Sequence, residues 1–336
     1  MDRAAQLQRW LEITLGSRDF SIAPASDDAS FRRYFRIRRD GSAPSLIAMD
    51  APPDREDCRS FVHVAQLFAD AGVHVPAIHA QDLQRGFLLI SDLGDTTYLA
   101  ALDADSAGQL YGQAFDALLH IQLASRPGAL PVYDRVLLER ELRLFSDWYI
   151  ARQMEIVLGN TQRAALEKSF SLLLDNNLAQ PRVFVHRDYH SRNLMVCKPC
   201  PGILDFQDAV YGPVTYDLVS LLRDAYVAWE EEQVVDWVIR YWEMARGARL
   251  PVSEDFAEFY RDFEWMGAQR QLKVLGIFAR LFHRDGKDAY MKDQPLVMRY
   301  LRRTCERYDA LAPLARVLEQ LDTGPLAPAG SPAPAR

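Results

Sequence analysis

The sequence predicts an α+β protein of two lobes: a small lobe with five strands and a helix, and a larger, mainly helical lobe. Strand patterns with period-2 alternation are concentrated in residues 20–93, and helical patterns dominate after residue 105. The exception is residues 183–206, where two apolar runs flank a polar loop. We therefore expect a small lobe over residues 1–93, a larger lobe over 94–321 and a tail over 322–336.

The elements of the small lobe follow from spacing and turn residues. Residues 1–16 carry apolar side chains at helical intervals, and residues 54–71 do so after an acidic start. The stretch 20–50 divides into three strands at two polar turns, and two more strands follow in residues 77–94. Alternation gives the second strand one densely cationic face, formed by Arg32, Tyr34, Arg36 and Arg38.

The second lobe is predicted from helical periodicity. We expect helices at residues 105–124, 134–158, 161–179, 215–228, 231–247, 253–281 and 295–319. The segment 183–206 is embedded among them. The tail, DTGPLAPAGSPAPAR, is rich in Pro, Ala and Gly, and we expect it to be disordered.

Composition limits the classes of function. The chain has 336 residues, 49% of them hydrophobic and 25% charged, which is typical of a soluble globular protein. Its net charge of −7 lacks the basic footprint of a nucleic-acid-binding protein. No apolar stretch reaches the roughly 20 residues of a membrane span, and the first residues form an amphipathic pattern rather than a signal peptide. We expect a cytoplasmic protein with no obligate protein partner.

The four cysteines do not indicate a disulfide framework in a chain of this size. Cys197 and Cys200 form a C-x-x-C pair, but no second pair or histidine cluster completes a zinc site. A hairpin turn is the favoured interpretation.

The segment 183–206, VFVHRDYHSRNLMVCKPCPGILDF, has the pattern of a phosphoryl-transfer centre. Asp188 lies in a loop between strands, where a carboxylate can meet a substrate hydroxyl and act as its base. Asn193 follows five residues later, and Asp205 ends the next strand. Their oxygens suit Mg²⁺, which is completed by water and nucleotide phosphates. Protein kinases use the same order of base, metal ligand, hairpin and metal ligand.

Several motifs together resemble the aminoglycoside phosphotransferase and choline kinase group of the protein-kinase-like fold. They are LLISDLGD, HRDYHSRN and LDFQD, and the resemblance covers the chain up to the tail. With DDASFRRYFRI and SLIAMDAPP added, the chain is similar to the bacterial anomeric kinases of N-acetylmuramate and N-acetylglucosamine. That similarity implies ATP and Mg²⁺ as cofactors and a sugar 1-phosphate, made for peptidoglycan recycling, as product.

The resemblance also implies roles for individual residues. Leu89, Ser91 and Leu93 belong to a hinge that binds adenine, although an ordinary buried strand explains them equally well. The sugar would contact residues drawn from His190, Arg192, Gln207, Asp208, Tyr211, Glu139 and Arg143. Glu139 and Arg143 also fit a solvated helix face with ion pairs. His186 and Asp217 are expected to be structural.

The chain departs from the kinase pattern at the phosphates. No glycine-rich loop joins the first two strands, where Ser30 is the candidate phosphate contact. On the third strand Ile47 and Met49 share a face, and Met49 stands where kinases have a lysine. Lys168 is the first lysine in the chain. If the phosphates are paired from this lobe, an arginine must replace it, and the candidates are Arg32, Arg33 and Arg36, with Glu56 or Asp57 as orienting acid. A solvated face of an edge strand is the alternative interpretation of these arginines.

Two alternatives remain open at this point. One is a kinase of another small alcohol, such as an aminoglycoside or choline. The other is a nucleotide-binding module without activity, which the missing lysine and glycine loop make conceivable and the intact Asp188, Asn193 and Asp205 oppose.

Overall fold

The computed structural model describes residues 2–26, 31–39 and 43–322 and divides the chain into two compact units. The first unit contains residues 1–124 and 186–209, and the second contains residues 125–185 and 210–336. The polar segment after residue 185 therefore belongs to the same unit as the small-lobe strands. The predicted lobe boundaries stay predictions, and the proline-rich tail from residue 323 lies outside the described residues.

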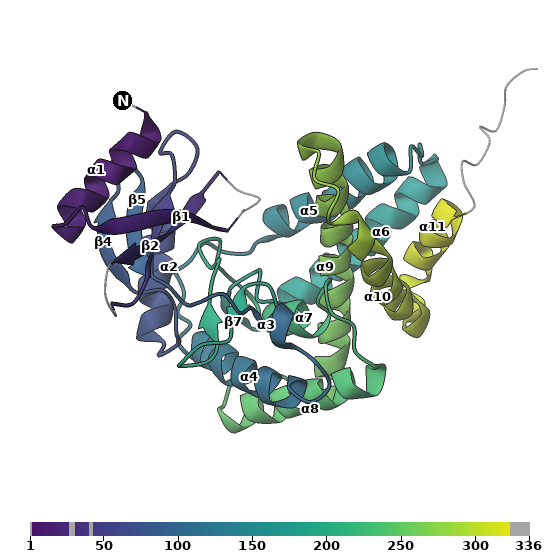
Figure 1. The fold of residues 1–336 in the computed structure, drawn as a ribbon. Coiled ribbons are helices and arrows are strands. Elements are labelled where there is room, and N and C mark those ends of the chain that lie inside the picture. Colours follow the sequence, from purple (N-terminus) through teal and green to yellow (C-terminus); the bar gives the residue numbers. More distant parts are fainter. Residues whose placement is uncertain (1, 27–30, 40–42, 323–336) are drawn as a thin grey trace, which may run out of the picture. The chain divides into compact units, whose positions relative to one another are not determined.

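The first unit is built on a five-stranded antiparallel sheet, which confirms the predicted small lobe (Figure 1). Its strand order is β1-β2-β3-β5-β4. The strands are β1 (Phe20–Ser26), β2 (Arg33–Arg39), β3 (Leu46–Asp50), β4 (Ile78–Asp82) and β5 (Phe87–Ser91). The unit also contains α1 (Arg3–Leu15), α2 (Cys58–Asp70), α3 (Tyr98–Ala101), α4 (Ala107–Leu123) and the hairpin β7 (Leu194–Met195) and β8 (Gly202–Ile203).

The two faces of the sheet carry different side chains. On one face, the apolar side of α1 packs against a buried cluster. That cluster consists of Leu7, Trp10, Leu11, Ile37, Ala48, Phe87 and Leu89. On the other face, the register pairs Tyr34 with Met49 and Arg36 with Ile47. The same register extends this face to Leu88 and Ile90 of β5. Because paired residues share a face, the α1 side is a dry core, whereas the opposite side presents three arginines of the 31–39 stretch, Arg32, Arg36 and Arg38.

The second unit is mainly helical, as predicted (Figure 1). Its long helices are α5 (Arg135–Leu144), α6 (Asn160–Ala179), α8 (Glu231–Gly247), α9 (Phe256–Asp285), α10 (Gln294–Arg307) and α11 (Ala312–Asp322). The shorter elements are η1 (Phe145–Gln153), β6 (Arg182–Val185), β9 (Val210–Pro213), α7 (Tyr216–Leu222), η2 (Met291–Asp293) and η3 (Asp309–Leu311). No helix among the described residues is long and apolar enough to cross a membrane.

Three helices differ from the predicted ranges for local reasons. The expected helix at 295–319 is divided, because Tyr308 is extended and Pro313 fits only the first turn of a new helix. The expected helix at 215–228 stops at Leu222, and the Asp224 carboxylate then accepts from the Tyr226 N–H, at 3.0 Å, in a turn.

The third difference is the conversion of the expected 134–158 helix into a π-helix, η1, after Leu144. Here α9 crosses close to the chain: a Cβ on Gly276 would lie 2.3 Å from the Leu144 carbonyl carbon. Only a glycine permits this approach, and helical periodicity does not reveal the change of helix type.

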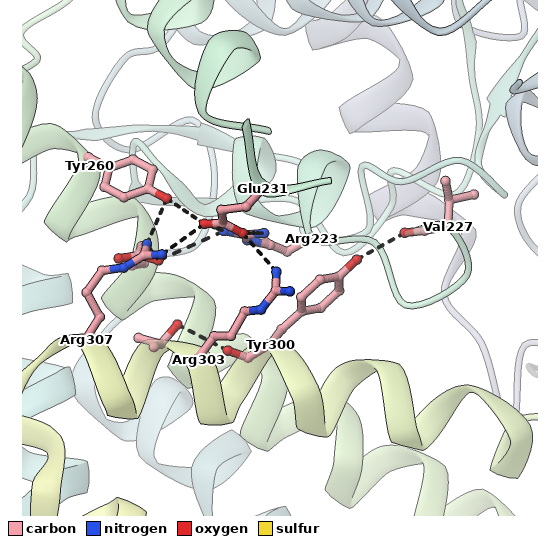
Figure 2. Close-up of polar contacts among 9 residues, drawn as sticks. Arg223, Val227, Glu231, Tyr260, Tyr300, Arg303 and Arg307 are labelled. Atoms are coloured by element: carbon pink, nitrogen blue, oxygen red, sulfur yellow. Dashed lines mark hydrogen bonds and ion pairs between the residues drawn. The ribbon is translucent and has the colours of Figure 1, made fainter. Parts of the chain in front are cut away.

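An ionic cluster around Glu231 joins α8, α9 and α10 in the second unit (Figure 2). The Glu231 carboxylate accepts from Arg223 at 2.9 and 2.8 Å, and from Arg303 and Arg307 at 3.2 Å each. Tyr260 donates to the same group at 3.0 Å. Burial would raise the pKa of Glu231, but these donors lower it to about 2.

We predict that Glu231→Gln lowers the free energy of unfolding by on the order of 2 kcal/mol at neutral pH, because three arginines lose their shared carboxylate. Glu231 contributes stability above its unfolded pKa of 4.5, and this contribution is lost as pH falls toward about 2. Urea unfolding across this range measures both effects. Glu232→Gln, at an exposed neighbour in the same helical turn, is the control, and equal losses in both variants would contradict the assignment.

Candidate active site

A cavity of about 360 Å³ lies within the first unit, on the face of the sheet opposite α1. Its wall combines β2, β3 and β5 with the segment 92–97, and residues of the loop 186–193 and of the hairpin complete it. The apolar lining is formed by Ile47, Phe61, Ile90, Leu93, Met195, Leu204 and Phe206. Charged and polar residues line it as well, among them Arg36, Asp92, Asp95, Arg192, Asn193 and Asp205. Such a site suits a planar apolar ring with a polar extension.

The structure brings the three predicted catalytic residues together where Asn193 and Asp205 line the cavity. The Asn193 side-chain amide donates to the Asp188 backbone carbonyl at 3.0 Å and to Asp205 Oδ2 at 3.5 Å. The segment after the hairpin is bonded to the loop as well, since the Leu204 N–H donates to the Asn193 carbonyl at 2.9 Å. Asp188, Asn193 and Asp205 therefore form one hydrogen-bonded group.

The Asp205 carboxylate is held in a defined orientation. Asp205 has a left-handed backbone, with φ of 60°, directly after the apolar strand. The Gln207 amide donates to Asp205 Oδ1 at 2.7 Å, which leaves Oδ2 facing Asn193. Gln207, predicted as a sugar contact, is thus engaged with Asp205, and its role toward the sugar stays a prediction. A left-handed non-glycine residue at a site of this kind is typical of a functional constraint.

The donor set fits a Mg²⁺ ion of the nucleotide-completed type. Because the Asn193 nitrogen is committed to a carbonyl, its oxygen is the atom available to a cation, and Asp205 adds a charged oxygen. Among the described residues, no group of three or more His, Cys, Asp or Glu side chains is arranged to hold a metal. An all-protein cage is therefore not formed there, and two protein ligands with phosphate and water are the arrangement that these residues fit.

His186 connects the loop to the segment between β8 and Asp205. Its ring Nε2 lies 2.9 Å from the Leu204 carbonyl, and the Asp188 backbone N–H donates to Nδ1 at 3.2 Å. These partners require a neutral ring with the proton on Nε2. Complete burial lowers the pKa of His186 to about 4, against the upward effect of Asp188. The bonds support the predicted structural role and leave no proton-accepting nitrogen for a substrate.

The arginines of the 31–39 stretch lie in different places. Arg33 is on the α1 face, where it donates to Asp50 at 2.5 Å. Arg36 lines the cavity and binds Asp92 at 2.6 and 3.1 Å and the Gly94 carbonyl at 3.3 Å. Arg32 donates to Glu56 at 2.8 Å, while Asp57 caps α2 and pairs with Arg59. Ser30 lies outside the described residues.

Of the predicted hinge, Ser91 and Leu93 line the cavity, but Leu89 packs in the α1 core and Met49 is fully buried. The sequence interpretation missed Asp92 and Asp95, which both bind Arg36. Ser45 adds a hydrogen bond to Asp92 at 2.7 Å. The motif ISDLGD contains both acids, but only the pairing of β2, β3 and β5 shows that they meet an arginine.

The predicted sugar contacts are divided between the units. Arg192 lines the cavity, His190 is half-buried in the same loop, and Asp208 is exposed, its carbonyl 3.4 Å from Arg187. Glu139, Arg143, Tyr211 and Asp217 belong to the second unit.

In that unit Arg143 pairs with Glu139 at 2.6 Å and with Glu167 at 2.9 Å, which matches the predicted alternative of a solvated ion-paired face. Tyr211 lies on β9, and Asp217 is fully buried in the first turn of α7. Cys197 and Cys200 lie in the β7–β8 turn, as predicted.

We predict that His186→Gln lowers the free energy of unfolding by about 2 kcal/mol, because a buried carbonyl and N–H lose their partners. A histidine whose folded pKa is below its unfolded value of 6.5 destabilises the fold as pH falls from there toward about 4. The variant should lack this part of the pH dependence in urea titrations. An unchanged slope between these pH values would refute the buried neutral state.

Comparison with known proteins agrees with this geometry. The family model described as "Phosphotransferase enzyme family" matches residues 21–251. The chain is 52% identical over 303 residues to the N-acetylmuramate/N-acetylglucosamine kinase of Pseudomonas aeruginosa, which covers 90% of this chain and 89% of that protein. It is 49% identical over 315 residues to the protein of the same name from Pseudomonas putida, with 94% and 91% covered.

Solved structures show the same fold at low identity. A choline/ethanolamine kinase family protein from Mesorhizobium loti matches with a TM-score of 0.63 and 12% identity, over 95% of this chain and 100% of that one. An ADP-bound aminoglycoside phosphotransferase matches with a TM-score of 0.56 and 12% identity, over 88% and 97%. The predicted protein-kinase-like fold is thus confirmed, and the chain belongs to the phosphotransferase enzyme family.

Proposed function

We propose that the protein phosphorylates an amino sugar, N-acetylmuramate or N-acetylglucosamine or both, at the anomeric hydroxyl with ATP as donor. The observation that carries the proposal is the hydrogen-bonded group of Asp188, Asn193 and Asp205 at the polar end of the cavity. The sugar is suggested by relatives of about half identity over most of both chains. The product would be a sugar 1-phosphate for peptidoglycan recycling, made in the cytoplasm, where ATP is supplied.

The nucleotide would occupy the cavity in one orientation. The apolar lining between Ile47, Ile90 and Leu93 accommodates an adenine ring, and the backbone after Ser91 offers hydrogen-bonding groups to its edge. The phosphates then extend toward Asn193 and Asp205. The ADP-bound state of a structural neighbour supports a nucleotide at this fold's cavity.

In the reaction, Asp188 would accept or orient the proton of the sugar hydroxyl while its oxygen attacks the γ-phosphorus in line. Asn193 and Asp205 would hold Mg²⁺, which neutralises charge on the phosphates when it is bound. His186 and Asn193 fix the loop around Asp188 through its own backbone N–H and carbonyl. The rate gain comes from positioning and charge neutralisation, not from a covalent intermediate.

A panel of acceptors tests the substrate class. Purified protein with ATP and Mg²⁺ is offered N-acetylmuramate, N-acetylglucosamine, choline and an aminoglycoside, and products are identified by ³¹P and anomeric ¹H NMR. We expect phosphorylation of the amino sugars at the anomeric position. If only choline or the aminoglycoside is phosphorylated, the proposal of an amino-sugar acceptor is wrong. If nucleotide binds but no acceptor is phosphorylated, the alternative of a nucleotide-binding module without activity is favoured.

Asp188→Ala and Asp205→Ala should each lower kcat by on the order of 10³-fold or more with the fold intact, since one removes the base and the other the charged metal ligand. Initial rates and thermal unfolding of both variants measure this. Asp70→Ala, at an exposed position of α2 in the same unit, is the matched control. Near-native turnover by a purified Asp205→Ala protein would contradict the assignment of Asp205 as a Mg²⁺ ligand.

A further inference from the structure

The first unit has to bind a highly anionic phosphate chain without the lysine that kinases use. Met49 occupies the corresponding position of β3 and is fully buried against Tyr34 and Leu88 in the register. In residues 1–124 and 186–209 the sequence contains a single lysine, Lys198, which is exposed in the β7–β8 turn. If a side chain of this unit pairs with the phosphates as a permanent cation, it is therefore expected to be an arginine.

Two of the three arginine candidates are committed elsewhere. Arg33 points to the α1 face and shares the buried Asp50 carboxylate with Arg3. Arg36 lies toward the hinge end, where Asp92, Asp95 and the Gly94 carbonyl surround its guanidinium. Its pKa is raised first of all by the hydrogen bond to Asp92, with burial acting against this. Its ion pairs with Asp92 and Asp95 thus link β2 to the segment after β5, on the hinge side of the cavity.

Arg32 is placed differently. It precedes Arg33, so alternation puts it on the cavity face, one step beyond Tyr34 and away from the hinge. Its side chain is only 10% exposed and is bound to Glu56, which lies just before α2. Burial would lower the pKa of Arg32, but Tyr34, Glu56, Asp205 and Asp208 together raise it. The guanidinium is therefore fully charged and lies in the field of the proposed metal ligand.

We propose that Arg32, positioned by Glu56, is the phosphate-binding cation of this protein and replaces the missing third-strand lysine from the stretch that precedes β2. A guanidinium can bind one oxygen of Glu56 and still present N–H groups to two phosphate oxygens, which an ammonium group cannot do with the same geometry. Glu56 then takes the part of the helix acid that pairs with the lysine in protein kinases. This inference rests on the proposed use of ATP, but not on the identity of the sugar.

The test measures nucleotide binding in the absence of any sugar. We expect Arg32→Ala to weaken ADP binding by about 10- to 100-fold, the usual effect of losing charge-assisted hydrogen bonds. Binding of adenosine, which has no phosphate, should change by less than about twofold. Ligand-observed NMR titrations of the full chain with Mg²⁺ present give both affinities. Arg38→Ala, an exposed arginine further along the same face, is the control and should leave both affinities unchanged.

Two further variants separate phosphate binding from simple neutralisation of Glu56. Arg32→Gln keeps most of the packing volume, and we expect the same loss of ADP affinity as in Arg32→Ala. The double variant Arg32→Ala with Glu56→Gln removes the unpaired acid, and its ADP affinity should stay low. Recovery of ADP binding in the double variant would overturn the proposal, as would equal losses for ADP and adenosine in Arg32→Ala. Failure of every sugar in the acceptor panel would not affect these results.

Discussion

The imidazole of His186 holds together the two halves of the candidate active site. One ring nitrogen donates to the Leu204 carbonyl, next to Asp205, and the other accepts the backbone N–H of Asp188. Because the ring is fully buried and neutral, both bonds persist at physiological pH. The Asn193 side-chain amide forms a second link between the two halves, since it donates to both the Asp188 carbonyl and the Asp205 carboxylate. The proposed base, Asp188, and the proposed metal ligand, Asp205, are thereby positioned by the backbone of a single compact unit.

Charge balance is the second constraint on this unit. Glu56, Asp205 and Asp208 all act on the Arg32 guanidinium and place negative charge beside the proposed phosphate site, where like charges at short range disfavour a bound anion. Arg32 offsets part of this charge, and Mg²⁺ would offset more. At the hinge end, Arg36 and its two acids form a balanced group that ties β2 to the segment after β5. The cavity therefore combines an apolar lining with charged side chains, and this combination matches the ring and the phosphates of a nucleotide.

Local patterns in the sequence were sufficient for the parts of the structure that depend on neighbours along the chain. Period-2 alternation predicted the five strands, and the spacing of Asp188, Asn193 and Asp205 predicted that they would meet. The partners of the arginines were not predictable in the same way, since Arg36 meets Asp92 across 56 residues and Arg32 meets Glu56 across 24. The π-helix after Leu144 was not predicted for the same reason, because Gly276, which packs against Leu144, belongs to a helix that is distant in the sequence.

Acceptor specificity is the property that spacing predicts least. Phosphoryl transfer needs a fixed order of oxygen ligands on one hairpin, so one short segment carries its pattern. A sugar is bound by side chains that converge from separate elements, and no period or motif marks them. Gln207 illustrates this: its position beside Asp205 predicted a hydroxyl contact, and its hydrogen bond to Asp205 could not be foreseen from spacing. The 186–208 segment thus carries the pattern of phosphoryl transfer, whereas an amino sugar as acceptor is indicated by relatives of about half identity over most of both chains.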